Sequence, residues 1–325
     1  MSYKLNAWYM PSQLAFLLTS VFGAVICLSS SHWLGVWAGL EVNLFGFIPF
    51  MSGDRRTGEM ESTIKYFLAQ EVGSGLLMMS VVFMLAVCGS GQIGTQGGCF
   101  TGLGLLLKTG IAPFHFWVPG AMAEISWVSC FLLSTLQKVG PLFSMFFFGN
   151  THFLVVVGAV SVVVGSVGGV FQTRLRPLLG YSSIAHMGWC LGCFGSVGSA
   201  YYYFGGYVLT LVGVFALLSE VGVYGMETTM SGGSWILLSL AVLSLAGFPP
   251  FALFFAKVQA LISIWSHAPF VVVFFLFGGA VSFFYYFNLA FTFALKGVMS
   301  TTQLSTKASF LLLVFLPLAG PLLVV

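Results

Sequence analysis

Eight ionisable side chains lie within or at the ends of long apolar segments, where a membrane-spanning helix would carry them into hydrocarbon. A lysine at that depth costs roughly 2.5–3.5 kcal/mol on insertion scales, so such residues normally face a bundle interior or a hydrated cavity. There they pair with one another or mark the route of an ion. The eight candidates are Glu41, Glu71, Lys108, Glu124, Lys138, His186, Glu220 and Lys257.

A lysine beside a carboxylate can take up and release a proton. Burial disfavours the charged form of lysine, and a nearby carboxylate favours it. A carboxylate that moves toward or away from Lys108 would therefore load or unload a proton, which arginine does not permit because it stays protonated in proteins. For any single residue the alternative is a buried ion pair that only fixes helix register. Three lysines at membrane depth, on three different spans, are more than ion pairs that only fix helix register would need.

Lys108 lies in a stretch that also contains helix-breaking residues, at 105–119 (LLLKTGIAPFHFWVP). A proline removes a backbone donor and clashes with the preceding turn, so Gly110 and Pro113 predict a broken helix. The pattern G-x-x-P-F recurs at residues 247–251, close to Lys257. Paired interrupted helices in corresponding halves are typical of inverted-repeat transporters with sites near the membrane midplane.

The composition indicates an all-α polytopic membrane protein. The 325 residues are 58% hydrophobic and only 6% charged, whereas a soluble domain has about 25% charged residues. The apolar runs are continuous rather than alternating, which excludes a transmembrane β-barrel. The net charge of +3 is too small to indicate a nucleic-acid partner, and the six cysteines lie in or beside apolar segments, which argues against a disulfide framework.

We expect about eleven spans in a single transmembrane domain over residues 1–325, with approximate halves at 1–150 and 151–325. The ninth expected span is too long for one straight crossing, so we interpret it as discontinuous at Gly247. The expected spans cover residues 12–30, 32–51, 62–88, 99–120, 125–148, 153–172, 178–194, 201–223, 235–265, 270–295 and 310–325.

The loop charges agree with this count. With eleven spans, the N-terminus and every second loop share one side and carry seven Lys and Arg residues, while the opposite side carries none. Positive residues concentrate on the inside face, so we place the N-terminus there and the C-terminus on the other side. The seven are Lys4, Arg55, Arg56, Arg174, Arg176, Lys296 and Lys307.

Three apparent ligand motifs do not support a cofactor or a metal. Residues 89–94 (GSGQIG) fit a dinucleotide pattern, but they join two membrane spans with no strand before them. His186, Cys190 and Cys193 share a helix face without an evident fourth ligand, and small residues at helix contacts explain the cysteines. His115 and His152 are expected to be interfacial or hydrogen-bonded core residues. We therefore expect no metal and no cofactor bound by this chain.

Seven segments, in order along the chain, resemble the NADH–ubiquinone oxidoreductase chain 2 family. These are the mitochondrially encoded, antiporter-like subunits of respiratory complex I. The eleven-span pattern is similar to the animal form, which lacks three N-terminal helices of bacterial counterparts. The segments are residues 37–43 (WAGLEVN), 61–70 (ESTIKYFLAQ), 107–119 (LKTGIAPFHFWVP), 137–141 (QKVGP), 172–176 (QTRLR), 181–189 (YSSIAHMGW) and 243–250 (LSLAGFPP).

The resemblance implies a role for each of five residues. Glu41 would pair with Lys108, and Lys138 would relay protons laterally between the halves. Lys257 would be the exit lysine of the second half, although relatives often have Pro-Lys-Trp where this chain has Ala256-Lys257-Val258. His186 matches a family position and would be a relay along a hydrated axis.

The expected function is that of a proton-translocating membrane-arm subunit, without redox chemistry of its own, in an NADH:ubiquinone reductase. Neighbouring antiporter-like subunits and lipids would be its partners, and the mitochondrial inner membrane its location, with the N-terminus in the matrix. Two alternatives remain open. One is a stand-alone secondary cation/proton antiporter, and the other is a structural spacer in the membrane arm.

Overall fold

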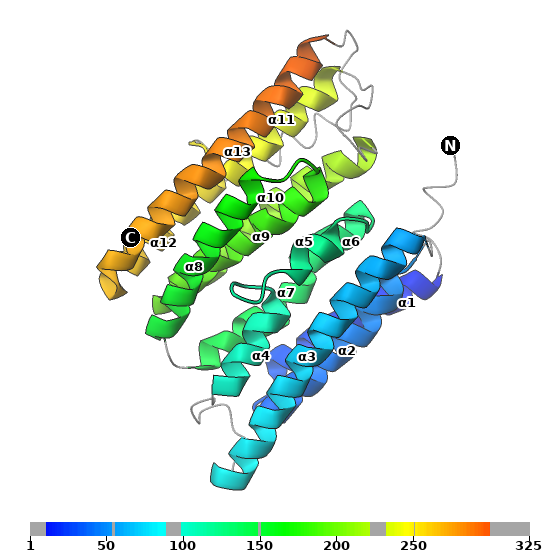
Figure 1. Cartoon of the computed structure of the whole chain (residues 1–325), viewed down its shortest axis with the longest axis vertical. Coiled ribbons are helices and arrows are strands. Elements are labelled where there is room, and N and C mark those ends of the chain that lie inside the picture. The colour runs from blue at the N-terminus through cyan, green and yellow to red at the C-terminus, as the bar shows by residue number, and fades with distance from the viewer. Residues whose placement is uncertain are drawn as a thin grey trace. The chain divides into compact units, whose positions relative to one another are not determined.

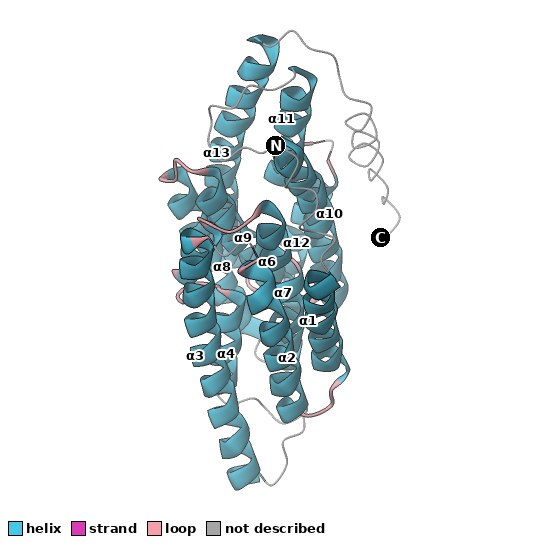
Figure 2. Cartoon of the chain, turned by 90° about the vertical axis from the view of Figure 1, so that its right-hand side faces the viewer, coloured by secondary structure: helices cyan, strands magenta, loops and turns pink. Residues whose placement is uncertain are grey.

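Helices make up all the regular structure that is described in the computed structural model, which covers residues 11–53, 56–88, 99–148, 151–221, 232–249 and 251–299. The chain divides into two compact units, Met1–Thr151 and His152–Val325. Figure 2 shows helices and connecting loops in the described parts, and no strand. The all-α prediction is confirmed.

The first unit begins with three long helices that lie side by side, α1 (Pro11–Ser29), α2 (Trp33–Met51) and α3 (Thr57–Cys88) (Figure 1). Glycines let α1 and α2 approach closely, because a Cβ on Gly39 would come within 2.5 Å of the backbone nitrogen of Cys27. Small residues at such contacts are the usual means of packing helices in a membrane.

Shorter helices complete the first unit, and they carry the breaks. Gly110, with φ +70°, ends the first of them, and Thr135 separates the third from the fourth. The elements are α4 (Cys99–Thr109), α5 (Trp117–Met122), α6 (Trp127–Ser134), α7 (Leu136–Ser144) and the 3-10 turn η2 (Met145–Phe148).

The second unit packs its first two helices through facing glycines. A Cβ on Gly158 would meet the carbonyl oxygen of Gly188 at 2.8 Å, and one on Gly188 would meet that of Gly158 at 2.6 Å. Gly247, with φ +74°, ends a later helix. The elements are α8 (Thr151–Val170), α9 (Leu175–Gly192), η3 (Cys193–Gly195), α10 (Val197–Val221), α11 (Gly232–Ala246), α12 (Ala252–His267), η4 (Pro269–Val271) and α13 (Val272–Met299).

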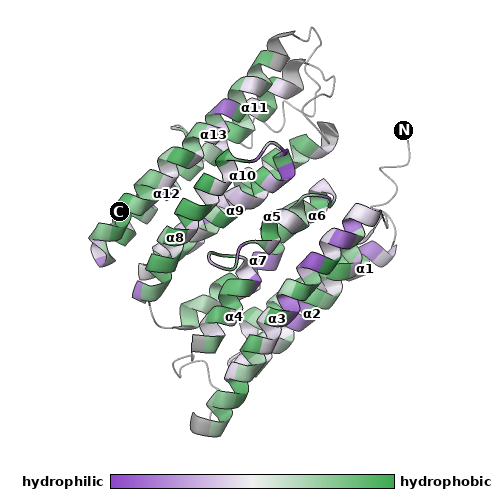
Figure 3. Cartoon of the chain, viewed as in Figure 1, coloured by the Kyte–Doolittle hydropathy of each residue, from purple (hydrophilic) through white to green (hydrophobic). Residues whose placement is uncertain are grey.

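Large apolar side chains remain exposed on several helices. The ribbons of these helices are largely green, the colour of hydrophobic residues, in Figure 3. Phe22 of α1 is 62% exposed, Phe83 of α3 is 61% exposed, and Val273 of α13 is 66% exposed. Apolar surface of this extent marks contact with a membrane or a partner. Among the described residues, seven helices are long and apolar enough to span a bilayer.

The expected spans agree with the helices except at some of their ends and at one break. Helix α3 begins at Thr57 rather than residue 62, α9 at Leu175 rather than 178, and α13 continues to Met299. Backbone hydrogen bonding continues past the hydrocarbon boundary, whereas hydropathy detects only the apolar part. The expected span at residues 125–148 agrees with the apolar stretch at residues 127–147, within which Thr135 separates α6 from α7. The expected span at 310–325 lies outside the described residues.

Candidate functional site

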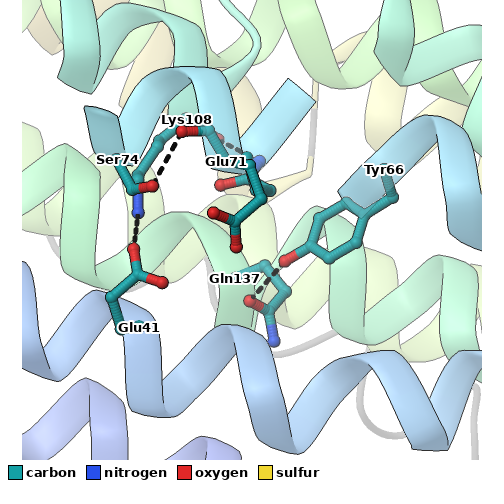
Figure 4. Close-up of polar contacts among 7 residues, drawn as sticks. Glu41, Tyr66, Glu71, Ser74, Lys108 and Gln137 are labelled. Carbon is teal, nitrogen blue, oxygen red and sulfur yellow. Dashed lines mark hydrogen bonds and ion pairs between the residues drawn. The ribbon is translucent and has the colours of Figure 1, made fainter. Parts of the chain in front are cut away.

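A buried ion pair joins Glu41 of α2 to Lys108 of α4. The Lys108 Nζ lies 3.1 Å from the Glu41 Oε1, and the two side chains are 1% and 12% exposed. Figure 4 shows the two side chains pointing toward each other. A buried pair of this kind is costly to form and is strongly disturbed when one partner is removed.

The end of α4 places Lys108 beside a backbone break. Gly110 takes a left-handed conformation that stops the helix, and the last carbonyl groups then need other donors. The indole nitrogen of Trp117 donates to the Leu107 oxygen at 3.0 Å, and the Gln70 amide donates to the Lys108 oxygen at 3.1 Å. The interruption predicted at residues 110–113 is therefore present, and two of the last carbonyl groups of α4 receive side-chain donors.

A second carboxylate acts on Lys108 electrostatically. The Glu71 carboxylate of α3 attracts the Lys108 ammonium. Cys27 of α1 lies 3.5 Å from the Ser144 hydroxyl of α7. Figure 4 shows the Glu71 carboxylate projecting into the same region as the Lys108–Glu41 pair. Lys108 thus pairs with one carboxylate and is within electrostatic reach of a second, from a different helix.

A chain of side-chain hydrogen bonds links three helices next to Lys138. The Tyr66 hydroxyl donates to the Gln137 oxygen at 3.0 Å, and the Gln137 amide donates to the Asn43 oxygen at 3.0 Å. All three side chains are buried. Gln137 directly precedes Lys138 on α7, and Asn43 follows Glu41 by two residues on α2. These hydrogen bonds therefore hold the helix that carries Lys138 against the helix that carries Glu41.

Lys138 is 2% exposed and lies in the first turn of α7, directly after the break at Thr135. The Thr135 hydroxyl donates to the Phe131 oxygen at 2.8 Å, which closes the end of α6. Pro141 lies inside α7 and cannot donate to the carbonyl of Gln137, four residues earlier. We expect this missing donor to contribute to the break at Thr135.

In the second unit, Lys257 of α12 binds the end of the preceding helix. Its Nζ donates to the Ala246 oxygen at 2.9 Å and lies 5.8 Å from the ring centre of Trp189. Ala246 is the last residue of α11, and a cation at a helix C-terminus is favoured by the helix dipole. This arrangement needs the Gly247 turn, so the interruption predicted there is confirmed.

His186 of α9 is 3% exposed and lies among tyrosines of the second unit. Its Nδ1 is 2.9 Å from the Tyr203 hydroxyl oxygen, and its Nε2 is 3.4 Å from that of Tyr286. These tyrosines could not be predicted, because nothing in a single sequence distinguishes them from apolar packing residues.

The remaining candidates have separate positions. Glu124 is exposed in the turn between α5 and α6, and the side chain of Glu220 lies outside the described residues. His115 is buried, with its Nδ1 3.2 Å from the Pro113 oxygen, and His152 is exposed at the start of α8. Within the described parts of the chain, no three His, Cys, Asp or Glu residues come together as a metal site.

The chain matches a known family over most of its length. Residues 30–284 match the family model described as "NADH:quinone oxidoreductase/Mrp antiporter, TM". The NADH-ubiquinone oxidoreductase chain 2 of Lumbricus terrestris is 31% identical over 289 residues, which cover 86% of each chain. That of Bos mutus grunniens is 31% identical over 320 residues, 93% of this chain and 92% of that one.

A solved structure shows the same fold. A chain of respiratory complex I from Thermus thermophilus is 25% identical, with a TM-score of 0.78, over 95% of this chain and 81% of that chain.

Proposed function

This chain belongs to the NADH–ubiquinone oxidoreductase chain 2 family, and from that premise we propose that it is a proton-translocating membrane-arm subunit of respiratory complex I. It performs no redox chemistry and binds no cofactor. Electron transfer elsewhere in the complex drives changes in its buried charges. Each charge that crosses the membrane works against about 2.3 kcal/mol per 100 mV.

The Lys108–Glu41 ion pair is the observation that carries this proposal. Both partners can change protonation, their side chains are only 1% and 12% exposed, and Lys108 lies at the end of a broken helix where the backbone can adjust. Glu71 provides a second carboxylate for the same lysine. A shift of Lys108 between the two carboxylates would change which one is neutralised, and a proton would follow.

The other candidates continue the route in each unit. Lys138 follows the pair in the first unit, on a helix that the Tyr66–Gln137–Asn43 hydrogen bonds hold against α2 and α3. In the second unit, His186 and Lys257 are the protonatable stations. The order of transfer that we propose is Glu41, Lys108, Lys138, His186, Lys257.

The location follows from the family and the loop charges. Animal members of the family imply the mitochondrial inner membrane, with other membrane-arm subunits and lipids around the chain. We propose that the N-terminus faces the matrix and the C-terminus the intermembrane space, because the expected loops carry lysine and arginine on the N-terminal side alone.

A charge-removing substitution tests the proposal. Lys108→Met and Lys138→Met should each lower proton pumping coupled to NADH oxidation while the complex still assembles. Lys65→Met is the matched control, since Lys65 is 49% exposed and pairs with Glu61 on the surface of the same unit. Normal pumping in the Lys108 and Lys138 variants would refute the relay.

Purification distinguishes the alternative of a stand-alone antiporter, to which the family model also extends. Recovery of the chain with many other subunits supports the complex. A functional homo-oligomer of this chain alone, active in cation/proton exchange, would support the antiporter.

A further inference from the structure

The His186 imidazole is enclosed by two tyrosine hydroxyls that come from different helices. Tyr203 of α10 lies 2.9 Å from Nδ1, and Tyr286 of α13 lies 3.4 Å from Nε2. Tyr203 is fully buried and Tyr286 is 1% exposed. Both ring nitrogens therefore face a group that can donate or accept a proton.

The pairing suits proton transfer through the ring. A neutral imidazole has one nitrogen that donates and one that accepts, and a phenol hydroxyl can do either. We propose that Tyr203 and Tyr286 are proton-transfer residues that form a three-member relay with His186 in the second unit. This inference rests on the proposed function, since it supplies the neighbours through which His186 would receive and release a proton.

One transfer can be written in balanced steps. A proton arrives at the Tyr203 oxygen while the hydroxyl proton of Tyr203 passes to His186 Nδ1. The proton on Nε2 passes to the Tyr286 oxygen, and the hydroxyl proton of Tyr286 leaves to the next acceptor. One proton enters and one leaves, and no charge stays behind. The imidazole must then return to its first tautomer, with the proton on Nε2, before the relay can pass another proton.

A buried hydroxyl of α9 lies one turn before His186. Ser182 is 1% exposed and donates to the Leu179 oxygen at 2.8 Å. In the proposed order of transfer, the proton that leaves Tyr286 goes on to Lys257.

The two contacts of the imidazole differ in length, and this difference indicates where transfer is controlled. The 2.9 Å contact with Tyr203 is an ordinary hydrogen bond, whereas the 3.4 Å contact with Tyr286 is long. Tyr286 must approach by a few tenths of an ångström for fast transfer. Small shifts of α13 against α9 would therefore open or close the relay.

Aromatic packing holds the rings in place around the imidazole. The Tyr207 ring lies 4.8 Å from the His186 ring, and the Trp189 ring stacks on Tyr203 with centres 6.2 Å apart. Trp189 also lies against Lys257, so the same aromatic cluster connects the histidine to the lysine of this unit. The rings fix the geometry, and the hydroxyls carry the proton.

Removal of single hydroxyl oxygens tests the proposal in the assembled complex, reconstituted into vesicles. Tyr203→Phe and Tyr286→Phe keep the rings, and Tyr201→Phe on α10, which is 54% exposed, is the matched control. We expect proton transfer through this unit to slow by about 100-fold in the first two variants, the lower end for loss of a positioned acid–base group. Protons pumped per NADH and the solvent deuterium isotope effect are the readouts, because a purely structural hydroxyl would change neither.

Lys108→Met in the same assay separates the possible outcomes. Loss of pumping in Lys108→Met with normal pumping and isotope effect in both tyrosine variants would overturn the tyrosine relay and leave the proposed function standing. Normal pumping in Lys108→Met would overturn the proposed function itself. Failure of both tyrosine variants to assemble would show that the hydroxyls maintain the fold, which also overturns the relay.

Discussion

Gly247→Ala tests how the helix break positions Lys257. Gly247 has φ +74°, and a Cβ built on it would lie 3.2 Å from Lys257 Cδ and 3.3 Å from Cε and Nζ. The substitution therefore strains the turn and presses on the end of a lysine side chain. Among the described residues other than its two chain neighbours, these lysine atoms are the nearest to the added methyl group, so the lysine is the group that must move.

The expected magnitudes follow from these two effects. A non-glycine residue in the left-handed region costs about 1–2 kcal/mol. The Lys257 side chain must shift by a few tenths of an ångström, which stretches its 2.9 Å hydrogen bond to Ala246 toward about 3.2–3.5 Å, the limit of such bonds. We expect modest destabilisation and a clear loss of pumping.

The assay compares Gly247→Ala with Gly205→Ala in the assembled complex. Gly205 lies on the exposed side of α10 with no atom within 4 Å of an added Cβ, so alanine there should stabilise by about 0.5–1 kcal/mol. Heat inactivation at one fixed scan rate and protons pumped per NADH are measured for both. Equal heat stability and equal pumping in the two variants would refute the role assigned to the Gly247 turn.

Three further predictions concern the first unit. Glu41→Gln should lower the free energy of unfolding by about 3–5 kcal/mol, because it leaves Lys108 buried without its charged partner. Adding Lys108→Met should recover part of that loss in a double-mutant cycle of heat stability, and strictly additive effects would contradict the pairing. Gln137→Leu should cost about 1–3 kcal/mol by leaving the Tyr66 hydroxyl unpaired, and stability equal to the unsubstituted complex would contradict the network. Pro141→Ala restores a backbone donor in α7 and should let α6 and α7 join into one helix. A solved structure of the variant with the Thr135 break intact would show that Pro141 does not cause the break.

Much of the helical architecture could be predicted because apolar composition dictates it. A long apolar run has to satisfy its own backbone in a membrane, so it forms a helix. The breaks at Gly110 and Gly247 were also predictable, since a glycine followed by proline within an apolar run has a local physical meaning. The pairing of Glu41 with Lys108 followed from a family resemblance, and the 3.1 Å distance is in keeping with it.

What could not be predicted depends on packing between distant segments. Tyr286 is 100 residues from His186 in the chain, and it meets the imidazole only because α13 packs against α9. The backbone oxygen that binds Lys257 likewise carries no sequence signal.

The two broken helices hold their lysines by different kinds of partner. Lys108 faces a carboxylate that one proton can neutralise, so chemistry alone can switch off its attraction. Lys257 faces the carbonyl end of α11, whose dipole is permanent, so its attraction changes when the helix end moves or when Lys257 itself loses its proton. Protonation of a partner can therefore release Lys108, whereas Lys257 is released only by its own deprotonation or by movement of the helix end.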